Sequence, residues 1–358
     1  METSEKIRHV KNYVKYNLSY AFNRPLTLPF EINFQMTNRC PLSCRMCNIP
    51  KIAKSPAEEL TVEEMKNVLD QIADWATSGI YVSFVGGESL VRKNDTIELV
   101  KHANSKNFHT TIVSNAHFLD KQTCNNLLDA GLKRLAISLD GATAATHDFI
   151  RGKGSFKKVI ETMNYMLEAR KAKQLSIKLD FNTVIMSHNF REAINIYHLA
   201  KKMGVDQVFY QAVVPDNTFQ NKGQSLYKTD LWIQENHLAE LESTIKKLIE
   251  IKRGKGSKII SNSIKYLQLI PSYFAQKNKF KPGPCLAGFV NLNIDPYGNI
   301  TTCGLGPNVN VKDGKLTNLW KSKEFAETRK KIKSCRQPCL MLCYEKLNLR
   351  DVFSYLIK

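Results

Sequence analysis

The sequence predicts an α/β protein with a partial, TIM-like (β/α)6 barrel and a small cysteine-rich C-terminal domain. Two observations predict this fold. Between residues 30 and 211, six strand-like runs alternate with helical patterns, and eight of the nine cysteines fall into two groups. The 358 residues are enough for one large domain or two ordinary ones, and 43% apolar with 24% charged residues is typical of a soluble globular protein.

The strand-like runs are short and separated by helical periodicity. The clearest helical pattern begins at Thr61, whose hydroxyl can form a capping box with Glu64, and two further patterns cover 156–167 and 190–197. Six strands joined by helical crossovers predict a parallel sheet with an active site at the carboxyl ends of its strands. The six predicted strands are 30–36, 81–86, 109–114, 134–140, 177–185 and 207–211.

Polar side chains alternate with apolar ones in the fourth and fifth predicted strands. If the apolar side chains pack under the helices, the polar ones face the barrel axis. A packed barrel core would carry Val, Ile and Leu there, so the pattern predicts a lumen that holds a polar ligand. The inward positions are Ala136, Ser138 and Asp140 in the fourth strand and Lys178, Asp180 and Asn182 in the fifth.

Around the barrel we expect three further regions. Residues 1–29 form an N-terminal helical extension, 30–225 the barrel, 226–280 a helical connector and 281–358 the C-terminal domain. The basic amphipathic start predicts a helix packed on the barrel, with weak membrane-surface contact as the alternative. The absence of a signal peptide or membrane-length apolar run predicts a cytoplasmic protein. The net charge of +19 admits polyanionic partners, but no nucleic-acid-binding signature accompanies it.

The first cysteine group has the spacing C-x3-C-x2-C. Cys40, Cys44 and Cys47 directly follow the first predicted strand. Three thiolates on one loop can each bind a different iron of a [4Fe–4S] cube and leave the fourth iron open. A zinc loop is the alternative, but closed zinc sites need four ligands, and no fourth Cys or His is near in sequence.

This loop resembles that of the radical S-adenosylmethionine (SAM) superfamily, and the resemblance extends from about residue 30 to 211. It implies that the cysteines hold a [4Fe–4S] cluster and that SAM chelates the open iron. One electron, from a donor such as ferredoxin or flavodoxin, then cleaves SAM to methionine and a 5′-deoxyadenosyl radical that abstracts substrate hydrogen. Met46 stands where the family places a hydrophobic residue near the adenine.

Further family motifs follow the second and third predicted strands. Gly86, Gly87 and Glu88 match the GGE motif, although Ser89 follows in place of the usual proline. The resemblance implies that the glutamate accepts a hydrogen bond from the SAM ammonium, while glycines let the backbone approach a ligand. Ser114 and Asn115 stand where Thr-Asn-Gly is common and are candidate cofactor neighbours.

Later motifs imply the remaining cofactor contacts. Ser138 and Asp140 belong to an ISLDG-like segment and are expected to bind the ribose hydroxyls. Arg151 is expected to pair with the SAM carboxylate, with a surface arginine as the alternative. Asn182 and Gln211 are weaker ribose or adenine candidates. No residue is assigned a catalytic role.

The second cysteine group resembles the SPASM or twitch extension of radical SAM enzymes. A hairpin around Gly298 separates two of its cysteines, and five cysteines are present where a full SPASM domain has seven. We therefore expect one auxiliary [4Fe–4S] cluster, bound by Cys285, Cys303 and two of the last three cysteines, with a zinc knuckle as the alternative. Cys124 is expected to be a buried packing residue. The five cysteines are Cys285, Cys303, Cys335, Cys339 and Cys343.

The motifs leave the substrate open. The basic composition and the inward Lys178 favour a polar small molecule, in particular an anionic sugar, nucleotide-sugar or lipid precursor. A radical SAM peptide maturase is the alternative, disfavoured because 1–29 is too short for a peptide-binding winged helix. A non-enzymatic Fe–S or zinc nucleic-acid-binding protein is the third hypothesis, but it would have no need of the GGE and ISLDG-like segments.

Overall fold

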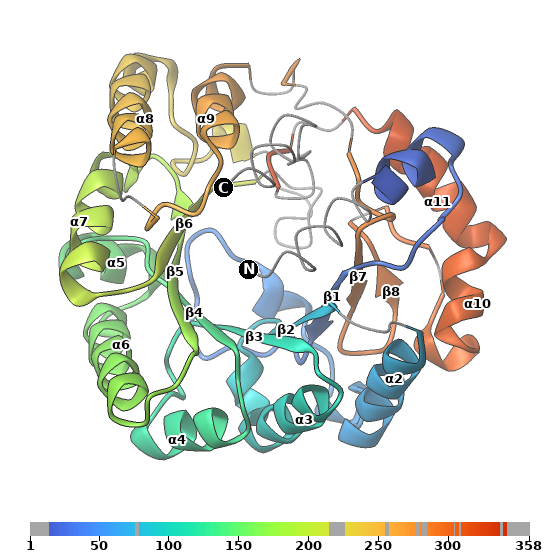
Figure 1. Ribbon diagram of the computed structural model, residues 1–358. Helices are drawn as coiled ribbons and strands as arrows, with labels where there is room; N and C mark the ends of the chain where they lie inside the picture. Colours follow the sequence, from blue (N-terminus) through green and yellow to red (C-terminus); the bar gives the residue numbers. More distant parts are fainter. Residues whose placement is uncertain are drawn as a thin grey trace.

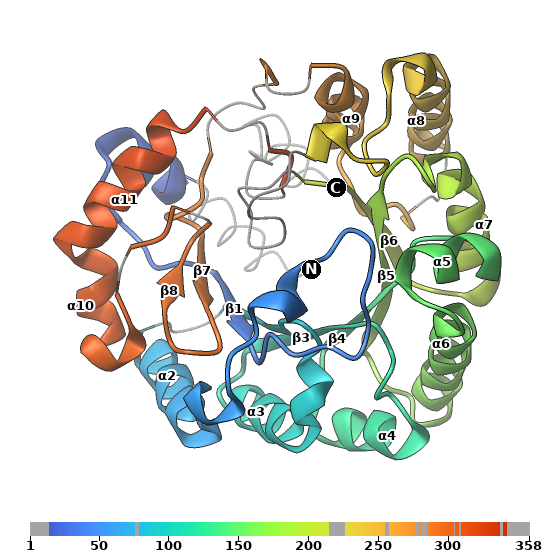
Figure 2. The ribbon, with the colours of Figure 1, turned by 180° about the vertical axis from the view of Figure 1, so that it is seen from behind.

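The structure is a computed structural model, in which eight strands form one sheet in the order β6-β5-β4-β3-β2-β1-β7-β8. The strands β1 to β6 pair in parallel, and helices surround them on the outside (Figures 1 and 2). The predicted α/β partial barrel is confirmed. The described residues are 14–75, 79–214, 226–254, 258–276, 279–280, 285–303, 305–307, 309–336 and 339–341.

The six predicted barrel strands all form, within two residues at each end. The structure also confirms the capping box, since the Thr61 amide donates to Glu64 at 2.8 Å and the Glu64 amide donates to the Thr61 hydroxyl at 3.2 Å. The barrel elements are β1 (Glu31–Gln35), α2 (Val62–Trp75), β2 (Tyr81–Val85), α3 (Lys93–Ser105), β3 (His109–Ser114), α4 (Lys121–Asp129), β4 (Arg134–Ser138), α5 (Ala144–Arg151), α6 (Ser155–Ala172), β5 (Lys178–Ile185), α7 (Ala193–Met203) and β6 (Gln207–Ala212).

The connector lies against the β6 edge of the barrel. It contains α8 (Leu238–Arg253) and α9 (Ile264–Gln276). Ile260 forms a parallel bridge with Val208, and the Asn262 side chain bonds both the amide and the carbonyl of Tyr210. The backbone groups on this edge of β6 are therefore satisfied within the chain rather than left exposed.

The C-terminal hairpin extends the barrel sheet on its other side. The strand β7 (Asn291–Ile294) pairs in parallel with β1, and β8 (Ile300–Thr301) returns antiparallel to β7. Beyond the hairpin lie α10 (Leu316–Lys321) and α11 (Lys323–Ser334), as Figure 1 shows. The boundary expected at residue 281 stays a prediction, although the hairpin shares one continuous sheet with the barrel.

The N-terminal segment is helical over the described residues 14–22 and lies beside α11 in both ribbon views (Figures 1 and 2). The Lys333 ammonium donates to the Tyr20 carbonyl at 2.8 Å, and the Trp320 indole donates to the Thr27 carbonyl at 3.2 Å. The helix thus packs against the C-terminal helices. Its outer face exposes Leu18 and Phe22, so the membrane-surface contact stays a prediction. Among the described helices, none combines the length and apolarity of a membrane span.

Candidate active site

The loop that carries the first three cysteines is held by hydrogen bonds to the end of β2. The Gly87 amide donates to the Thr37 carbonyl at 2.7 Å, and the Glu88 amide donates to the Arg39 carbonyl at 2.9 Å. Behind the loop, the buried Glu59 accepts from the Thr37 hydroxyl at 2.5 Å and from the Arg39 guanidinium at 2.9 Å. The approach to Cys40 is therefore fixed by both backbone and charged side-chain bonds.

The two glycines of the GGE motif are required by this loop. A Cβ on Gly87 would lie 2.5 Å from the Arg39 and Asn38 carbonyl oxygens, and one on Gly86 would overlap the Thr37 carbonyl. Gly86 also has φ +142°, which a residue with a side chain rarely adopts. The sequence predicted that these glycines let the backbone approach a ligand. The structure gives a second reason for glycine, which is that the cysteine loop packs directly against both residues.

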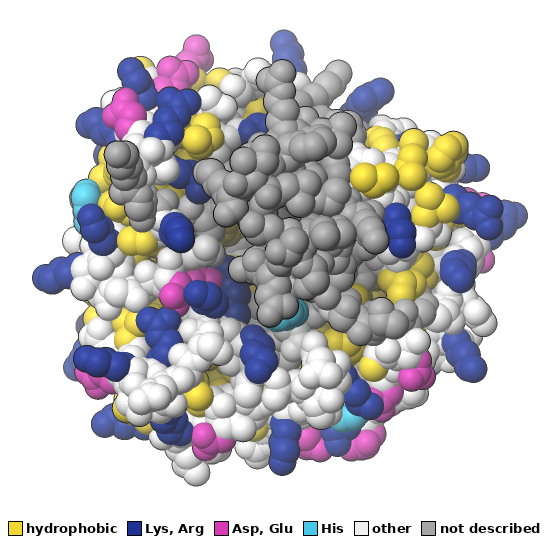
Figure 3. Space-filling view, in the orientation of Figure 1, with side chains coloured by type: hydrophobic (Ala, Val, Ile, Leu, Met, Phe, Trp, Pro, Cys, Tyr) yellow, Lys and Arg dark blue, Asp and Glu magenta, His cyan; other side chains and the backbone are white. Residues whose placement is uncertain are grey.

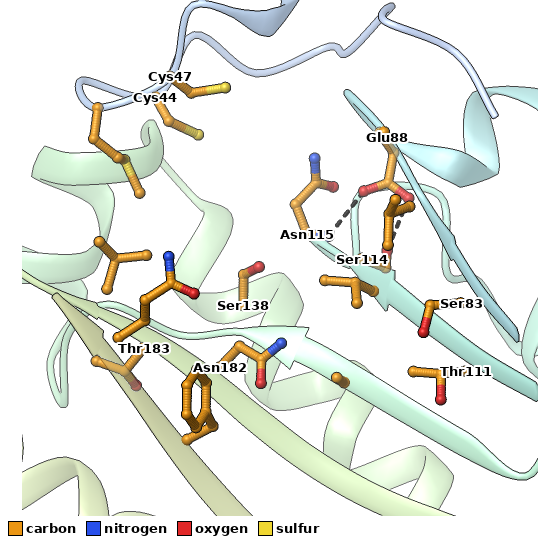
Figure 4. Close-up of a pocket in the computed structure, with 18 of the residues that line it drawn as sticks. Cys44, Cys47, Ser83, Glu88, Thr111, Ser114, Asn115, Ser138, Asn182 and Thr183 are labelled. Carbon is orange, nitrogen blue, oxygen red and sulfur yellow. Dashed lines mark hydrogen bonds between the residues drawn. The ribbon is translucent and has the colours of Figure 1, made fainter. Parts of the chain in front are cut away.

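Glu88 is buried and bound to the end of β3. Its carboxylate accepts from the Ser114 hydroxyl at 2.9 Å, the Asn115 amide at 2.8 Å and the Leu90 amide at 3.2 Å. Burial raises the pKa of Glu88, while the Asn115 and Leu90 amides oppose that rise. Glu88 lines the cavity, and Figure 4 shows its bonds to Ser114 and Asn115 across from Cys44 and Cys47.

The three thiols lie at the carboxyl end of the barrel. The side-chain nitrogen Nδ2 of Asn115 is 3.4 Å from the Cys40 sulfur, and the Cys44 sulfur is 3.9 Å from the Arg151 carbonyl oxygen. Burial raises the pKa of Cys40 to about 11 and also raises the pKa values of Cys44 and Cys47. Ligation would have to displace these protons, because thiolates are the metal-binding form.

Asp140 occupies a different place from the one expected. Its side chain is fully buried, and it accepts from the Arg151 guanidinium at 2.5 Å and from the Val184 amide at 2.7 Å. Both carboxylate oxygens are therefore used inside the protein, and Asp140 does not line the cavity. The expectation that it binds ribose is corrected accordingly, because this carboxylate orients Arg151, which does line the cavity.

A cavity of about 540 Å³ runs along the inside of the barrel. The other nine expected cofactor residues line it, together with the three cysteines and Met46. Sequence reasoning did not single out a second polar set from the inward positions of β1, β2, β3 and β6, although the same alternation would have found them. The expected residues are Gly86, Gly87, Glu88, Ser114, Asn115, Ser138, Arg151, Asn182 and Gln211, and the additional set includes Glu31, Asn33, Ser83, Thr111 and Gln207.

Among the described residues that line the cavity, Glu31 and Glu88 equal Arg134 and Arg151 in number. Lys178 lies outside it, 67% exposed and 3.8 Å from Asp206, because it begins β5 at the end far from the cysteines. Among the cavity residues, Arg134 pairs with Asp180 at 2.5 Å, as Arg151 pairs with Asp140. On the face seen in Figure 3, basic side chains are dispersed among acidic ones. The expected anionic substrate therefore loses its support from Lys178.

The second cysteine group is divided between two places: Cys303 lies near the amino end of β1, whereas Cys339 precedes Leu340 and Met341, which bond Tyr266 and Gln211 near the carboxyl end of β6. Glu31 is opposite Asn291 in the parallel pair of β1 and β7, so Cys303, after the antiparallel β8, lies near the amino end of β1. Burial raises the pKa of Cys303 to about 11, and the charges of Cys285 and Cys335 add to the rise. Cys285 and Cys335 therefore both lie within electrostatic range of Cys303.

Of the last two cysteines in this group, the structure describes only Cys339. Cys339 is near Tyr273, whose pKa burial raises well above its usual value, with the charge of Cys339 adding to the rise. Cys343 lies outside the described residues. Of the last three cysteines, Cys335 is the one that the described contacts group with Cys285 and Cys303.

Comparison with known families decides the interpretation of the first site. Residues 34–200 match the model of the radical SAM superfamily. This part of the chain is a radical SAM domain. The match covers β1 to α7, and it includes the cysteine loop and the GGE motif.

Relatives of this radical SAM protein extend over the auxiliary region as well. It is 26% identical over 331 residues to a PqqA peptide cyclase of Rhodopseudomonas palustris, covering 90% of this chain and 81% of the relative. It is also 24% identical over 330 residues to an AdoMet-dependent heme synthase of Methanosarcina barkeri, covering 89% and 90%. The chain is thus a radical SAM enzyme with a C-terminal auxiliary domain.

Solved structures share this fold. Streptococcus suis SuiB bound to S-adenosylmethionine has a TM-score of 0.67 at 17% identity, covering 90% of this chain and 73% of SuiB. An anSMEcpe structure with bound AdoMet has a TM-score of 0.63 at 17% identity, covering 92% and 98%. Both likenesses extend well beyond the barrel.

The donor set fits the clusters that a radical SAM enzyme uses. Cys40, Cys44 and Cys47 lie on one loop that lines the cavity, and each of the three thiolates could bind a different iron of a [4Fe–4S] cube.

Proposed function

We propose that this radical SAM enzyme modifies a peptide, with Cys40, Cys44 and Cys47 as ligands of the SAM-binding cluster. The observation that carries the proposal is the near full-length similarity to PqqA peptide cyclases. It favours the peptide alternative over the small molecule expected from the sequence. When bound, the cluster and SAM supply hydrogen-atom abstraction by a 5′-deoxyadenosyl radical.

The residues at the carboxyl end of the barrel would bind and orient SAM. Glu88 faces the cavity opposite the cysteine loop, where its carboxylate can accept from an ammonium group (Figure 4). Arg151 can pair with a carboxylate while Asp140 holds its other side at 2.5 Å. Ser138 and Asn182, on neighbouring strands, offer hydrogen bonds to ribose hydroxyls.

The rest of the cavity would receive the substrate. Its deeper walls carry Asn33, Ser83, Thr111 and Gln207, which are uncharged hydrogen-bonding side chains suited to peptide groups. A peptide substrate was disfavoured above because residues 1–29 are too short for a winged helix, but a protein of the same fold binds a peptide. This chain covers 97% of native anSMEcpe, which was crystallised with bound AdoMet and a Cp18Cys peptide. A peptide can thus bind this fold without an added domain of that kind. A ferredoxin or flavodoxin would supply the electron.

A deuterium-transfer experiment tests the proposal. The source organism is grown in deuterated medium, and its heat-stable extract below 10 kDa is incubated with the reconstituted enzyme, unlabelled SAM and dithionite. Abstraction from the true substrate puts deuterium into 5′-deoxyadenosine, which mass spectrometry measures. We expect prior proteinase K treatment of the extract to abolish the label. Label that survives the protease would show a small-molecule substrate and overturn the proposal.

A further inference from the structure

Arg329, on α11, is a fully buried arginine without a carboxylate partner in the described part of the chain. Its Nε donates to the Gly288 carbonyl at 2.7 Å and its Nη2 to the Trp320 carbonyl at 2.8 Å, but Nη1 has no hydrogen-bond partner. The guanidinium carbon lies 4.4 Å from the ring centre of Trp320 and 5.0 Å from that of Phe325. One donor is thus left unsatisfied in an apolar enclosure.

Such a charge is unusual inside a protein. Burial lowers the pKa of Arg329 to about 10, which still leaves it protonated at neutral pH. Aromatic faces and carbonyl dipoles offset part of the desolvation cost, but buried charges are normally paired with an opposite charge. Arg151 follows this rule by pairing with Asp140. Arg329 has no corresponding anion among the side chains of the described residues.

The position of Arg329 indicates where that anion would lie. Gly288, which receives its Nε bond, is three residues after Cys285. A Cβ on Gly288 would lie 3.5 Å from Arg329 Cγ and 3.7 Å from the side chain of Thr302, the residue before Cys303. The guanidinium therefore lies behind the two segments that carry Cys285 and Cys303.

The third nearby cysteine is on the same helix as Arg329. Cys335 is the C-cap of α11, and its amide donates to the Ile332 carbonyl at 3.1 Å. Six residues along a helix span about 9 Å. Arg329 is thus six residues before Cys335, and its Nε is bound to Gly288, which is three residues after Cys285 and packs against Thr302 next to Cys303.

We propose that Arg329 is the internal countercharge of the auxiliary cluster. This inference rests on the assignment of an iron–sulfur cluster to Cys285, Cys303 and Cys335, and it is independent of the substrate. A thiolate-bound cluster is anionic, and reduction by one electron adds a further negative charge. A nearby cation in a low-dielectric interior favours the reduced form, so Arg329 raises the reduction potential of the cluster.

The test uses the full chain with Cys40, Cys44 and Cys47 changed to alanine, so that spectroscopic signals come from the auxiliary site. Arg329→Met removes the charge and Arg329→Lys keeps it, while Arg191→Met makes the same charge change at an exposed residue that pairs with Glu240. The ratio of reduced to oxidised cluster is measured by EPR during a dithionite titration. At a fixed potential we expect Arg329→Met to lower this ratio at least tenfold, which is about 59 mV for one electron.

The two controls make the interpretation specific. Arg329→Lys and Arg191→Met should both stay within threefold of the parent ratio. An unchanged ratio in an iron-loaded Arg329→Met variant would overturn the proposal. If Arg329→Met binds no cluster, the Arg329→Lys variant is decisive. A cluster that forms in Arg329→Lys with the parent ratio of reduced to oxidised form supports a charge role, and failure of that variant to bind a cluster refutes it. If the parent chain binds no auxiliary iron, both the assignment of the cluster and the role of Arg329 are wrong. If the substrate proves not to be a peptide, neither of these two assignments is affected.

Discussion

The two cysteine sites are built in opposite ways. Cys40, Cys44 and Cys47 lie on one loop of eight residues, whose path is set by backbone bonds to the neighbouring GGE segment. Cys285, Cys303 and Cys335 come from three separate segments, and the charges of Cys285 and Cys335 act on Cys303 only once the hairpin and α11 are folded together. The first site is therefore a local structure that the barrel supports, and the second is a product of tertiary folding.

The sites also differ in what they face. The first three cysteines line the cavity, while none of the described auxiliary cysteines does. Cys303 lies near the amino end of β1 and the first three cysteines follow its carboxyl end, and the five residues of β1 span about 16 Å. The first site is thus placed to act on bound molecules, and the second to serve as structure or in electron transfer.

The largest expected effect comes from removing the first cysteine site, which lines the cavity. The triple change of Cys40, Cys44 and Cys47 to alanine should abolish SAM cleavage, because these are the thiols that line the cavity in the described part of the chain. Iron content should fall from about eight atoms to about four, the content of one [4Fe–4S] cube. Anaerobic 5′-deoxyadenosine formation and iron analysis measure both quantities. Cys124→Ala, which changes a buried thiol on α4, is the control, and cleavage in the triple variant would refute the assignment.

Removing the auxiliary site should separate SAM cleavage from substrate turnover. Changing Cys285 and Cys303 to alanine should abolish product formation but leave slow, uncoupled SAM cleavage at the first site. The reason is that both thiols lie at the far end of β1 and do not line the cavity. Product and 5′-deoxyadenosine are quantified in the same reaction. Complete loss of both would mean that the first site depends on the second.

The difference between the sites also explains what the sequence could predict. The barrel strands, the capping box at Thr61 and the cysteine loop depend on short-range patterns, and the structure has each of them. The burial of Asp140 was not predicted, because it depends on contacts with Arg151 and with Val184 on another strand. The exposure of Lys178 was missed because alternation gives the side of a strand but not the depth along the barrel.

A third experiment tests how tightly the GGE segment fixes the first site. Gly87→Ala should lower the free energy of unfolding by about 3 kcal/mol, the scale of a serious backbone clash, because its Cβ would lie 2.5 Å from two loop carbonyls. We expect iron binding at the first site to weaken while the auxiliary cluster stays loaded. Denaturant unfolding and EPR measure the two effects. Gly254→Ala, at the end of α8, is the control with a 3.2 Å contact, and equal losses in both variants would contradict the loop argument.

A fourth experiment tests the corrected role of Asp140. Asp140→Asn removes the charge that pairs with the buried Arg151, so the free energy of unfolding should fall by about 3 kcal/mol. Glu240→Gln breaks an exposed pair with Arg191 and should cost about 0–1 kcal/mol. Urea denaturation compares the two variants. A SAM-binding defect in Asp140→Asn without loss of stability would restore direct ribose binding by this carboxylate.

The smallest expected effect concerns pH, where the two sites should behave alike despite their different construction. Burial raises the pKa values of Cys40 and Cys303 to about 11. A thiol that holds its proton more tightly when folded stabilises the metal-free chain below its unfolded pKa of about 9, and this contribution is lost as the pH rises toward 11. A rise from about 9 to about 11 corresponds to about 3 kcal/mol for a fully enclosed group, and solvent screening of these partly exposed thiols lowers the expected loss to about 1–2 kcal/mol each. Iron binding should show the opposite trend and strengthen with pH up to tenfold per unit for each proton released.

Thermal unfolding of the metal-free protein between pH 8 and 11, together with iron binding at pH 7 to 9, measures these two trends. Cys40→Ala and Cys303→Ala should each flatten the stability curve by a similar amount, because the same burial effect acts on both thiols. Flattening by only one of them would show that the other thiol is open to solvent in the metal-free chain. Since the auxiliary thiols come from separate segments and the first three from one loop, an open auxiliary site would mean that its cluster, rather than packing alone, draws those segments together.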